Sequence, residues 1–139
     1  MRIAVVYFGE KEKKRLAALA HALGEGLESQ GAQVEVYDYK DLSRPLALYQ
    51  FLVVGTENQG TFGGKIPGPM ANFLKNSGSL GSKRCCAFVL RRGWRVNKAL
   101  LGLMRLMEKE GMFVVNSALL LSPEEARSCG KTLNIEHKR

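Results

Sequence analysis

The chain has 139 residues, of which 45% are hydrophobic, and its formal net charge is +8. This length fits one domain with a single well-buried core. No apolar run approaches the roughly 20 residues that a membrane-spanning helix needs, and the first residues lack the pattern of a signal peptide. We therefore expect one cytoplasmic domain over residues 1–139, without a membrane partner.

The positive charge is concentrated in the second half of the chain. Residues 1–70 contain 8 basic and 8 acidic side chains, whereas residues 71–139 contain 13 basic and 5 acidic side chains. A basic half favours an anionic ligand, nucleic acid or an acidic partner. A solvated surface without a partner explains the same charge equally well.

The three cysteines do not indicate a disulfide framework or a zinc site. Cys85 and Cys86 are adjacent in a strand-like run, so their side chains should point to opposite faces of the sheet. We interpret them as small buried thiols, with a vicinal redox pair as the alternative. The sequence also contains no Ser/His/Asp set and no metal-ligand cluster, so we assign no catalytic and no metal-binding residue.

The first half of the chain is predicted to contain two strands separated by a helix. Residues 2–8 are apolar and β-branched, which predicts a central strand buried on both faces. A charged turn over residues 9–15 precedes leucines at helical spacing, and Gly31 ends that helix. Residues 33–39 alternate valines with polar side chains, as an edge strand does. The link over residues 40–50 has room for only one or two helical turns.

Residues 51–74 form the most distinctive stretch of the sequence. The apolar run at residues 51–54 predicts a buried strand, and a polar, glycine-rich loop follows over residues 56–64. Pro67 and Pro69 then bracket the start of a helix. The loop is longer than a simple connection requires, so we expect it to form part of a site.

The rest of the chain adds two strands and two helices. Residues 83–90 and 112–121 predict strands, and the exposed loop at residues 91–95 and a helix ending at Gly111 lie between them. Ser122 is the expected N-cap of the last helix, with Pro123 at its first position and acidic residues in its first turn.

Strand and helix alternate five times, which is typical of an α/β domain whose parallel sheet carries helices on both faces. Right-handed crossovers and the strand count favour the order 2-1-3-4-5. In that order a ligand crevice lies beyond the carboxyl ends of the first and third strands. The loops over residues 8–14, 56–67 and 91–96 should meet there.

The sequence excludes two other classes of protein that have a similar order of strands and helices. A response-regulator receiver needs acidic residues after the first strand and an aspartate after the third, where this chain has Tyr7-Phe8-Gly9 and Gly55-Thr56. A dinucleotide-binding unit needs three spaced glycines after the first strand, and one is present.

The order and spacing of several short motifs resemble the flavodoxin-like family, which includes flavodoxins and flavodoxin-like quinone reductases. The resemblance covers nearly the whole chain and implies a three-layer sandwich around a five-stranded parallel sheet. Its most specific matches are Gly55-Thr56, Phe62-Gly63, Pro69-Met70, Asn72-Phe73-Leu74, Leu80-Gly81-Ser82-Lys83 and residues 108–115.

The resemblance also implies FMN as the cofactor. In the family, the first loop holds the phosphate, while the third-strand loop and aromatic side chains hold the isoalloxazine ring. Here Gly9, Lys11 and Lys13 would meet the phosphate, and Trp94 would stack on the ring, unless Trp94 is instead a lid over the edge of the core. The candidate cofactor-binding residues are Phe8, Gly9, Lys11, Lys13, Thr56, Asn58, Gln59, Gly60, Phe62, Gly63, Arg91, Gly93 and Trp94.

The first loop departs from the family's pattern. Residues 9–15, GEKEKKR, contain one glycine and no hydroxyl group. Lysines could supply charge to a phosphate but not a fitted cradle of donors, and Glu10 and Glu12 oppose them. The alternative is that this segment is only the solvated start of a helix.

Two functional hypotheses follow. The first, which we favour, is an FMN-binding redox protein that carries electrons or reduces a small acceptor such as a quinone; as an enzyme it would be an FMN-dependent oxidoreductase. Its partner would be a redox protein or a small-molecule acceptor, and a homodimer is left open. The second is a flavin-free interaction or regulatory module whose basic half faces an acidic protein or, less favoured, nucleic acid.

Overall fold

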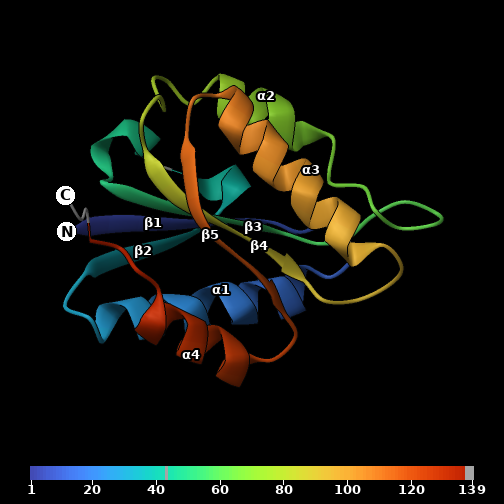
Figure 1. Cartoon of the computed structure of the whole chain (residues 1–139), viewed down its shortest axis with the longest axis horizontal. Coiled ribbons are helices and arrows are strands. Elements are labelled where there is room, and N and C mark those ends of the chain that lie inside the picture. Colours follow the sequence, from blue (N-terminus) through green and yellow to red (C-terminus); the bar gives the residue numbers. More distant parts are fainter. Residues whose placement is uncertain (43, 137–139) are drawn as a thin grey trace.

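The structure, a computed structural model, describes residues 1–42 and 44–136. Its centre is a five-stranded parallel sheet in the order β2-β1-β3-β4-β5, as the sequence predicts (Figure 1). The observed bounds of the five strands differ from the predicted ones by at most two residues. The strands are β1 (Arg2–Phe8), β2 (Gln33–Asp38), β3 (Phe51–Thr56), β4 (Arg84–Leu90) and β5 (Phe113–Leu120).

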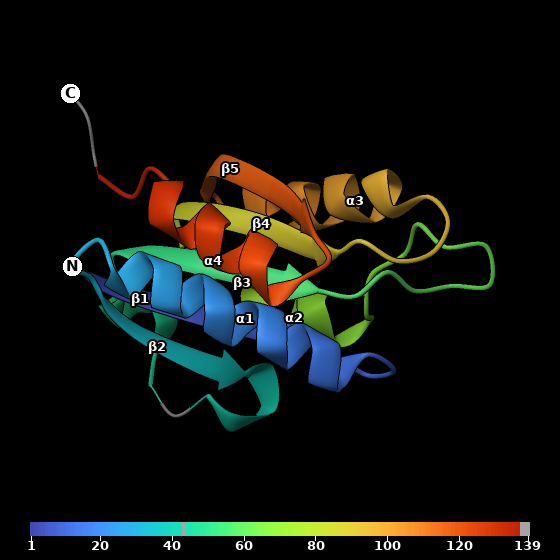
Figure 2. The ribbon, with the colours of Figure 1, turned by 90° about the horizontal axis from the view of Figure 1, so that it is seen from below.

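Helices cover both faces of the sheet (Figures 1 and 2). One face carries α1 (Lys13–Glu28) and α4 (Pro123–Thr132), and the other carries α2 (Pro69–Lys75) and α3 (Val96–Lys109). The predicted short link between β2 and β3 is confirmed, because its described residues form two 3-10 turns, η1 (Tyr39–Asp41) and η2 (Leu46–Leu48), and no longer helix. No helix in the described part of the chain is long and apolar enough to cross a membrane.

The sheet separates two hydrophobic clusters, and the adjacent cysteines illustrate the division. Cys86 packs in the cluster under α1 and α4, whereas Cys85 packs in the cluster under α2 and α3. Burial raises the pKa of Cys85 to about 12 and also raises the pKa of Cys86. Both thiols therefore stay protonated near neutral pH, which agrees with their interpretation as buried structural groups.

Helices α1 and α4 meet closely through two glycines. A Cβ atom at Gly130 would lie 2.2 Å from the Leu23 carbonyl oxygen, and one at Gly26 would lie 2.2 Å from that of Arg127. Only glycine permits such a backbone contact between helices. The predicted start of α4 is also confirmed, since the Ser122 hydroxyl accepts from the Glu125 amide at 3.2 Å.

β2 is an edge strand, as predicted, but one of its polar side chains is buried. Asp38 is buried and not solvated, and its carboxylate pairs with the Lys13 ammonium at 2.6 Å. Burial would raise the pKa of Asp38, but the hydrogen bond and charge of Lys13 and the Lys40 amide outweigh it and lower the pKa. This pair ties the start of α1 to the end of β2.

Candidate functional site at the carboxyl end of the sheet

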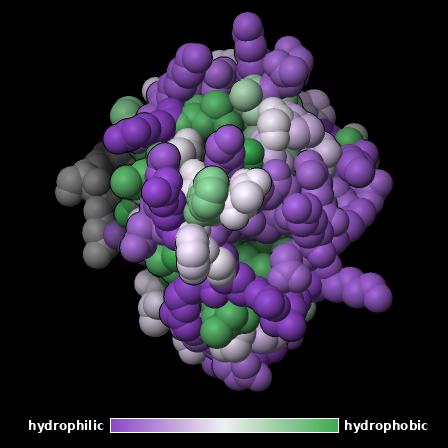
Figure 3. Space-filling model, turned by 90° about the vertical axis from the view of Figure 1, so that its right-hand side faces the viewer, coloured by the Kyte–Doolittle hydropathy of each residue, from purple (hydrophilic) through white to green (hydrophobic). Residues whose placement is uncertain are grey.

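Three loops meet at the carboxyl end of the sheet, as the strand order predicted. They follow β1, β3 and β4 and comprise residues 9–12, 57–68 and 91–95. Figure 3 views this end of the molecule, where hydrophilic side chains surround separate hydrophobic ones. The side chains of two neighbouring residues, Glu57 and Asn58, join the three loops to one another.

The Glu57 carboxylate lies against the backbone amides that lead into α1, and the residue is only 1% exposed. Its Oε1 accepts hydrogen bonds from the amides of Glu10 at 2.6 Å and Glu12 at 3.1 Å, and its Oε2 accepts from the amide of Lys11 at 3.0 Å. The Gln59 side chain donates to Oε2 at 3.1 Å. The chain therefore supplies its own anion to this helix start.

The strand register and a tight turn produce this contact. Phe8 of β1 is the partner of Thr56 in β3, so the next residues of both strands leave the sheet side by side. A Cβ atom at Gly9 would lie 2.8 Å from the Lys13 Cα, which makes glycine necessary in the turn. The free N–H groups of a helix start attract a negative charge, and Glu57 is placed to provide it.

The carboxylate of Glu57 is held in its ionised form. Burial alone would raise its pKa, but the hydrogen bonds from three backbone amides and Gln59 outweigh burial. The pKa of Glu57 therefore lies below the ordinary value of 4.5. At neutral pH the site contains a permanent negative charge.

Glu57 is absent from the residues that the sequence predicted for this site. Two signals could have indicated it. An acidic residue directly follows a buried strand next to β1, and the facing loop of residues 9–15 has amides but no hydroxyl group. The hydrogen bonds of Glu57 to the three amides span 45 to 47 positions in the chain, beyond the reach of local patterns.

The lysines predicted to meet a phosphate, and the candidate cofactor-binding residues Phe8 and Thr56, have other contacts. Lys13 pairs with Asp38, and Lys11 gives its amide to Glu57. Phe8 is buried and stacks on Tyr39, with ring centroids 4.5 Å apart. The buried Thr56 hydroxyl donates to the Phe8 carbonyl at 2.9 Å. These side chains hold β1, β3 and the link after β2 together.

Asn58 joins the loop after β3 to the loop after β4. Its side-chain amide donates to the carbonyls of Arg92 at 3.0 Å and Trp94 at 2.8 Å, and its oxygen accepts from the Gly64 amide at 2.7 Å. A Cβ atom at Gly63, where φ is 74°, would lie 1.8 Å from the Trp94 carbonyl oxygen. The two loops predicted to hold a flavin ring are therefore in direct contact.

The tips of these loops expose two aromatic side chains. Phe62 is 65% exposed and Trp94 is 74% exposed. The interpretation of Trp94 as a lid over the core edge is therefore wrong. Gly60, on the same loop as Phe62, and Gly93, next to Trp94, have positive φ angles of 98° and 85°, which glycine permits in such turns.

Arginines flank the aromatic tips, and two of them are paired with carboxylates. Arg91 lies 3.3 Å from Glu125, and Arg92 lies 3.3 Å from Glu12. Gln59 exchanges two backbone hydrogen bonds with Lys65, at 2.7 and 3.0 Å, which closes the loop after β3 into a narrow hairpin. The backbone of this part of the site is thus fixed, while its outward side chains are free to contact another molecule.

As arranged here, these residues do not fit the phosphate of FMN at the predicted position. The amides of residues 10–12 already bind Glu57. A phosphate beside that buried carboxylate would meet like-charge repulsion, which is strong where water is excluded. Ring binding between the loops would also require the Asn58 contacts to open.

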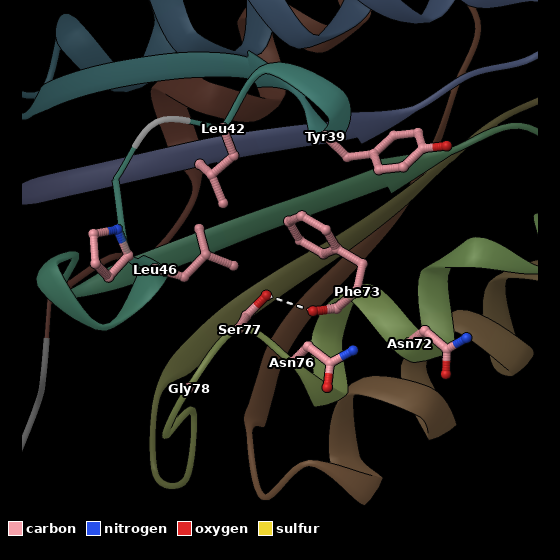
Figure 4. A pocket seen from close by; sticks show the side chains of 9 residues that line it. Tyr39, Leu42, Leu46, Asn72, Phe73, Asn76, Ser77 and Gly78 are labelled. Carbon is pink, nitrogen blue, oxygen red and sulfur yellow. Dashed lines mark hydrogen bonds between the residues drawn. The ribbon is translucent and has the colours of Figure 1, made fainter.

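A large hollow lies elsewhere, between the link after β2 and the end of α2 (Figure 4). Its volume is about 620 Å³, and Leu42, Leu46 and Phe73 point toward one another inside it. None of its described lining residues is Lys, Arg, Asp or Glu, and none belongs to the three loops. It exists because short 3-10 turns cover this part of the sheet.

The fold and the site define a class of α/β protein: a parallel sheet in which a carboxylate of the chain itself binds the amides after the first strand. Comparison with solved structures identifies the fold as flavodoxin-like. A flavodoxin from the domain Archaea matches with a TM-score of 0.76 and 22% sequence identity, covering 99% of this chain and 100% of that one.

Two further structures extend this similarity. The two-electron reduced flavodoxin of Megasphaera elsdenii matches with a TM-score of 0.74 and 16% identity, covering 93% of this chain and 96% of that one. A flavodoxin, WrbA-like protein from Agrobacterium tumefaciens matches with a TM-score of 0.67 and 20% identity, covering 94% and 92%. No protein-family model and no curated protein sequence matches the chain.

Proposed function

We propose that this protein is a flavin-free interaction module of the flavodoxin-like fold, which binds an acidic partner protein. The observation that carries the proposal is the Glu57 carboxylate on the amides of residues 10–12. A cofactor phosphate would need the same donors. Because Glu57 belongs to the chain, any such cofactor has to displace it.

Displacement of Glu57 is unfavourable for two reasons. Hydrogen bonds to a charged group contribute roughly 1.5–3 kcal/mol each, and the carboxylate accepts three from the backbone. A displaced carboxylate would also remain near the incoming phosphate, because β3 holds its backbone one residue away. Phosphate binding at this helix start therefore has to offset both costs.

The surface around the closed site has the composition of a protein-binding surface. We call Phe62, Lys65, Trp94, Arg95 and Lys98 the basic–aromatic rim. Within the described residues, its three cations have no carboxylate at salt-bridge distance. Lys98 packs beside Gly64, which links α3 to the loop of Phe62. Exposed aromatic and arginine side chains are frequent anchors of interfaces, and cations steer an acidic partner.

The fold favours a second candidate, an FMN-binding redox protein that carries electrons or reduces a small acceptor. Matches to flavodoxins over nearly the full length of this chain support it. In that candidate Glu57 leaves the amides, the Asn58 contacts open, and Trp94 stacks on the ring. It predicts a yellow protein or micromolar FMN binding.

An FMN titration separates the two candidates. We expect colourless protein, unchanged FMN fluorescence at micromolar protein, and no visible-absorbance shift. The variant Glu57→Ser removes the carboxylate, and tighter FMN binding by this variant than by wild type would identify Glu57 as the group that excludes the phosphate. Micromolar binding by wild type, weakened by Trp94→Ala, would overturn the proposed function.

The rim is tested separately with immobilised polyglutamate. Lys98→Glu, in the rim, should lower retention more than Lys131→Glu, which makes the same charge change at an exposed position of α4. Retention should weaken as salt increases. Equal loss of retention in the two variants would show that retention depends on the net charge of the protein and not on the position of the rim.

A further inference from the structure

A groove runs between α2 and α3, on the face of the sheet opposite α1 and α4. Two adjoining hollows of about 380 and 270 Å³ form it, and they share Ala71, Leu106 and Lys109. Ile66 and Pro67 add to its apolar lining. Gly102 leaves it open, because a Cβ atom there would meet no atom within 4 Å.

Cations border this apolar groove on both sides. Lys75 of α2 and Arg105 and Lys109 of α3 line it and are exposed. In residues 1–42 and 44–136, none of these three has a carboxylate at salt-bridge distance, and Glu110 is the one acidic residue of the lining. Arg105 and Lys109 are four residues apart on one helix, so they repel each other. A ligand carboxylate would relieve that repulsion.

We propose that this groove binds a short, acidic, amphipathic helix of the partner protein. Apolar side chains of such a helix would enter between α2 and α3, and its carboxylates would reach the bordering cations. The groove continues from the basic–aromatic rim, because Ile66 follows Lys65 and α3 begins directly after Arg95. The inference rests on the proposed function and specifies the partner's contacting element.

The dimensions of the groove set the length of the bound segment. Its lining spans residues 68–75 beside α2 and 102–110 beside α3. At 1.5 Å per helical residue this corresponds to about 10–12 Å. About two turns of a ligand helix fit, with apolar residues at i, i+3 or i+4, and i+7. An extended nucleic acid strand would offer phosphates to the cations but no apolar side chains to the lining.

The test uses a fluorescein-labelled 18-residue peptide with leucines at those spacings and glutamates beside them. Fluorescence anisotropy of this peptide with the full chain should show saturable binding that weakens with salt. Lys109→Glu and Gly102→Phe should each weaken binding about tenfold or more, because one reverses a bordering charge and the other fills the groove. Lys131→Glu, at an exposed position of α4 outside the groove, is the matched charge control and should leave the affinity within about twofold.

Several results would overturn the groove. Two concern the protein: equal loss of peptide affinity in Lys109→Glu and Lys131→Glu, or unchanged affinity in a Gly102→Phe protein whose circular dichroism is native. Two concern the ligand: tighter binding of a peptide with lysine in place of glutamate, or displacement of the peptide by a short single-stranded oligonucleotide. The FMN titration distinguishes the two levels of inference. Micromolar FMN binding by wild type would overturn the proposed function. If the protein binds no FMN and the groove substitutions leave peptide affinity unchanged, only the proposal for the groove is overturned.

Discussion

The α1–α4 layer and the α2–α3 layer cover opposite faces of one sheet, but their helices meet in different ways. Gly26 and Gly130 bring the backbones of α1 and α4 into contact, and an added Cβ atom would lie 2.2 Å from a facing carbonyl oxygen. Gly102 of α3 faces open space. The same residue type therefore closes one layer and opens the other. The surfaces that we propose to bind a partner lie on the open layer.

The difference extends to the carboxyl end of the sheet. Glu57 fixes the start of α1 through three backbone amides, and Lys13 adds a second tie to Asp38. The start of α3 carries Trp94 and Arg95 into solvent. Substitutions in the closed layer should therefore cost stability, whereas substitutions in the open layer should change binding and leave stability nearly unchanged.

The largest effect is expected for Gly130→Ala. Its Cβ atom would lie 2.2 Å from the Leu23 carbonyl oxygen and 2.9 Å from the Leu27 nitrogen, so α1 and α4 must separate. We expect the free energy of unfolding to fall by about 3 kcal/mol in urea denaturation. The matched control, Gly102→Ala, should raise it by up to about 1 kcal/mol, because alanine is the better helix former. Equal losses in both variants would contradict the difference between the layers.

A smaller loss is expected for Glu57→Ala. It removes the acceptor of three backbone amides, and we expect about 2 kcal/mol less stability. Glu57→Gln retains one acceptor oxygen and should lose about half as much. Chemical denaturation of the two variants at neutral pH measures both values. Equal stability of Glu57→Ala and wild type would contradict this prediction. It would mean that water replaces the carboxylate on the three amides without loss of stability.

Acid should weaken the closed layer through the same group. The folded pKa of Glu57 is lowered from 4.5, so its stabilising contribution is complete above the unfolded pKa and is lost as the pH falls through the folded value. Asp38 behaves in the same direction. Unfolding free energies measured from pH 6 to pH 2 should decline below about pH 4.5. Glu57→Gln should show a shallower decline, and parallel curves would rule out this titration.

The smallest effect is expected for Trp94→Ala in the open layer. The side chain is 74% exposed, and its backbone carbonyl, which Asn58 binds, remains in the variant. Stability should change by less than about 0.5 kcal/mol. Trp94 is the one tryptophan of the chain, so its emission should be that of a water-exposed indole and iodide should quench it. A larger stability loss would mean that the indole packs against the protein in solution.

The sequence predicted the framework well because burial leaves a local pattern. The apolar runs of β1 and β3 indicated central strands, and Ser122 with Pro123 indicated the start of α4. The burial of Asp38 was not predicted, because an alternating pattern does not reveal that Lys13, at the start of the preceding helix, neutralises it. Trp94 was left with two interpretations, since spacing alone does not decide whether a loop residue folds back.

The sequence predicted the position of the site but not the side-chain contacts that form it. The strand order brought the correct three loops together. The contacts of Glu57 and Asn58 link loops that are 34 or more residues apart, and their geometry depends on the finished sheet. A search for a phosphate-binding loop looks for donors, whereas the decisive residue here is an acceptor in the loop after a different strand.

The covalent attachment of Glu57 to the chain also affects how other anions compete for the amides of residues 10–12. A carboxylate attached to β3 cannot diffuse away, so to the amides of residues 10–12 it behaves as a competitor at an effective concentration of roughly millimolar or more. An anion of equal intrinsic affinity would have to exceed that concentration to displace the carboxylate. Near neutral pH the occupant of this helix start is therefore supplied by folding and does not have to be recruited from solution.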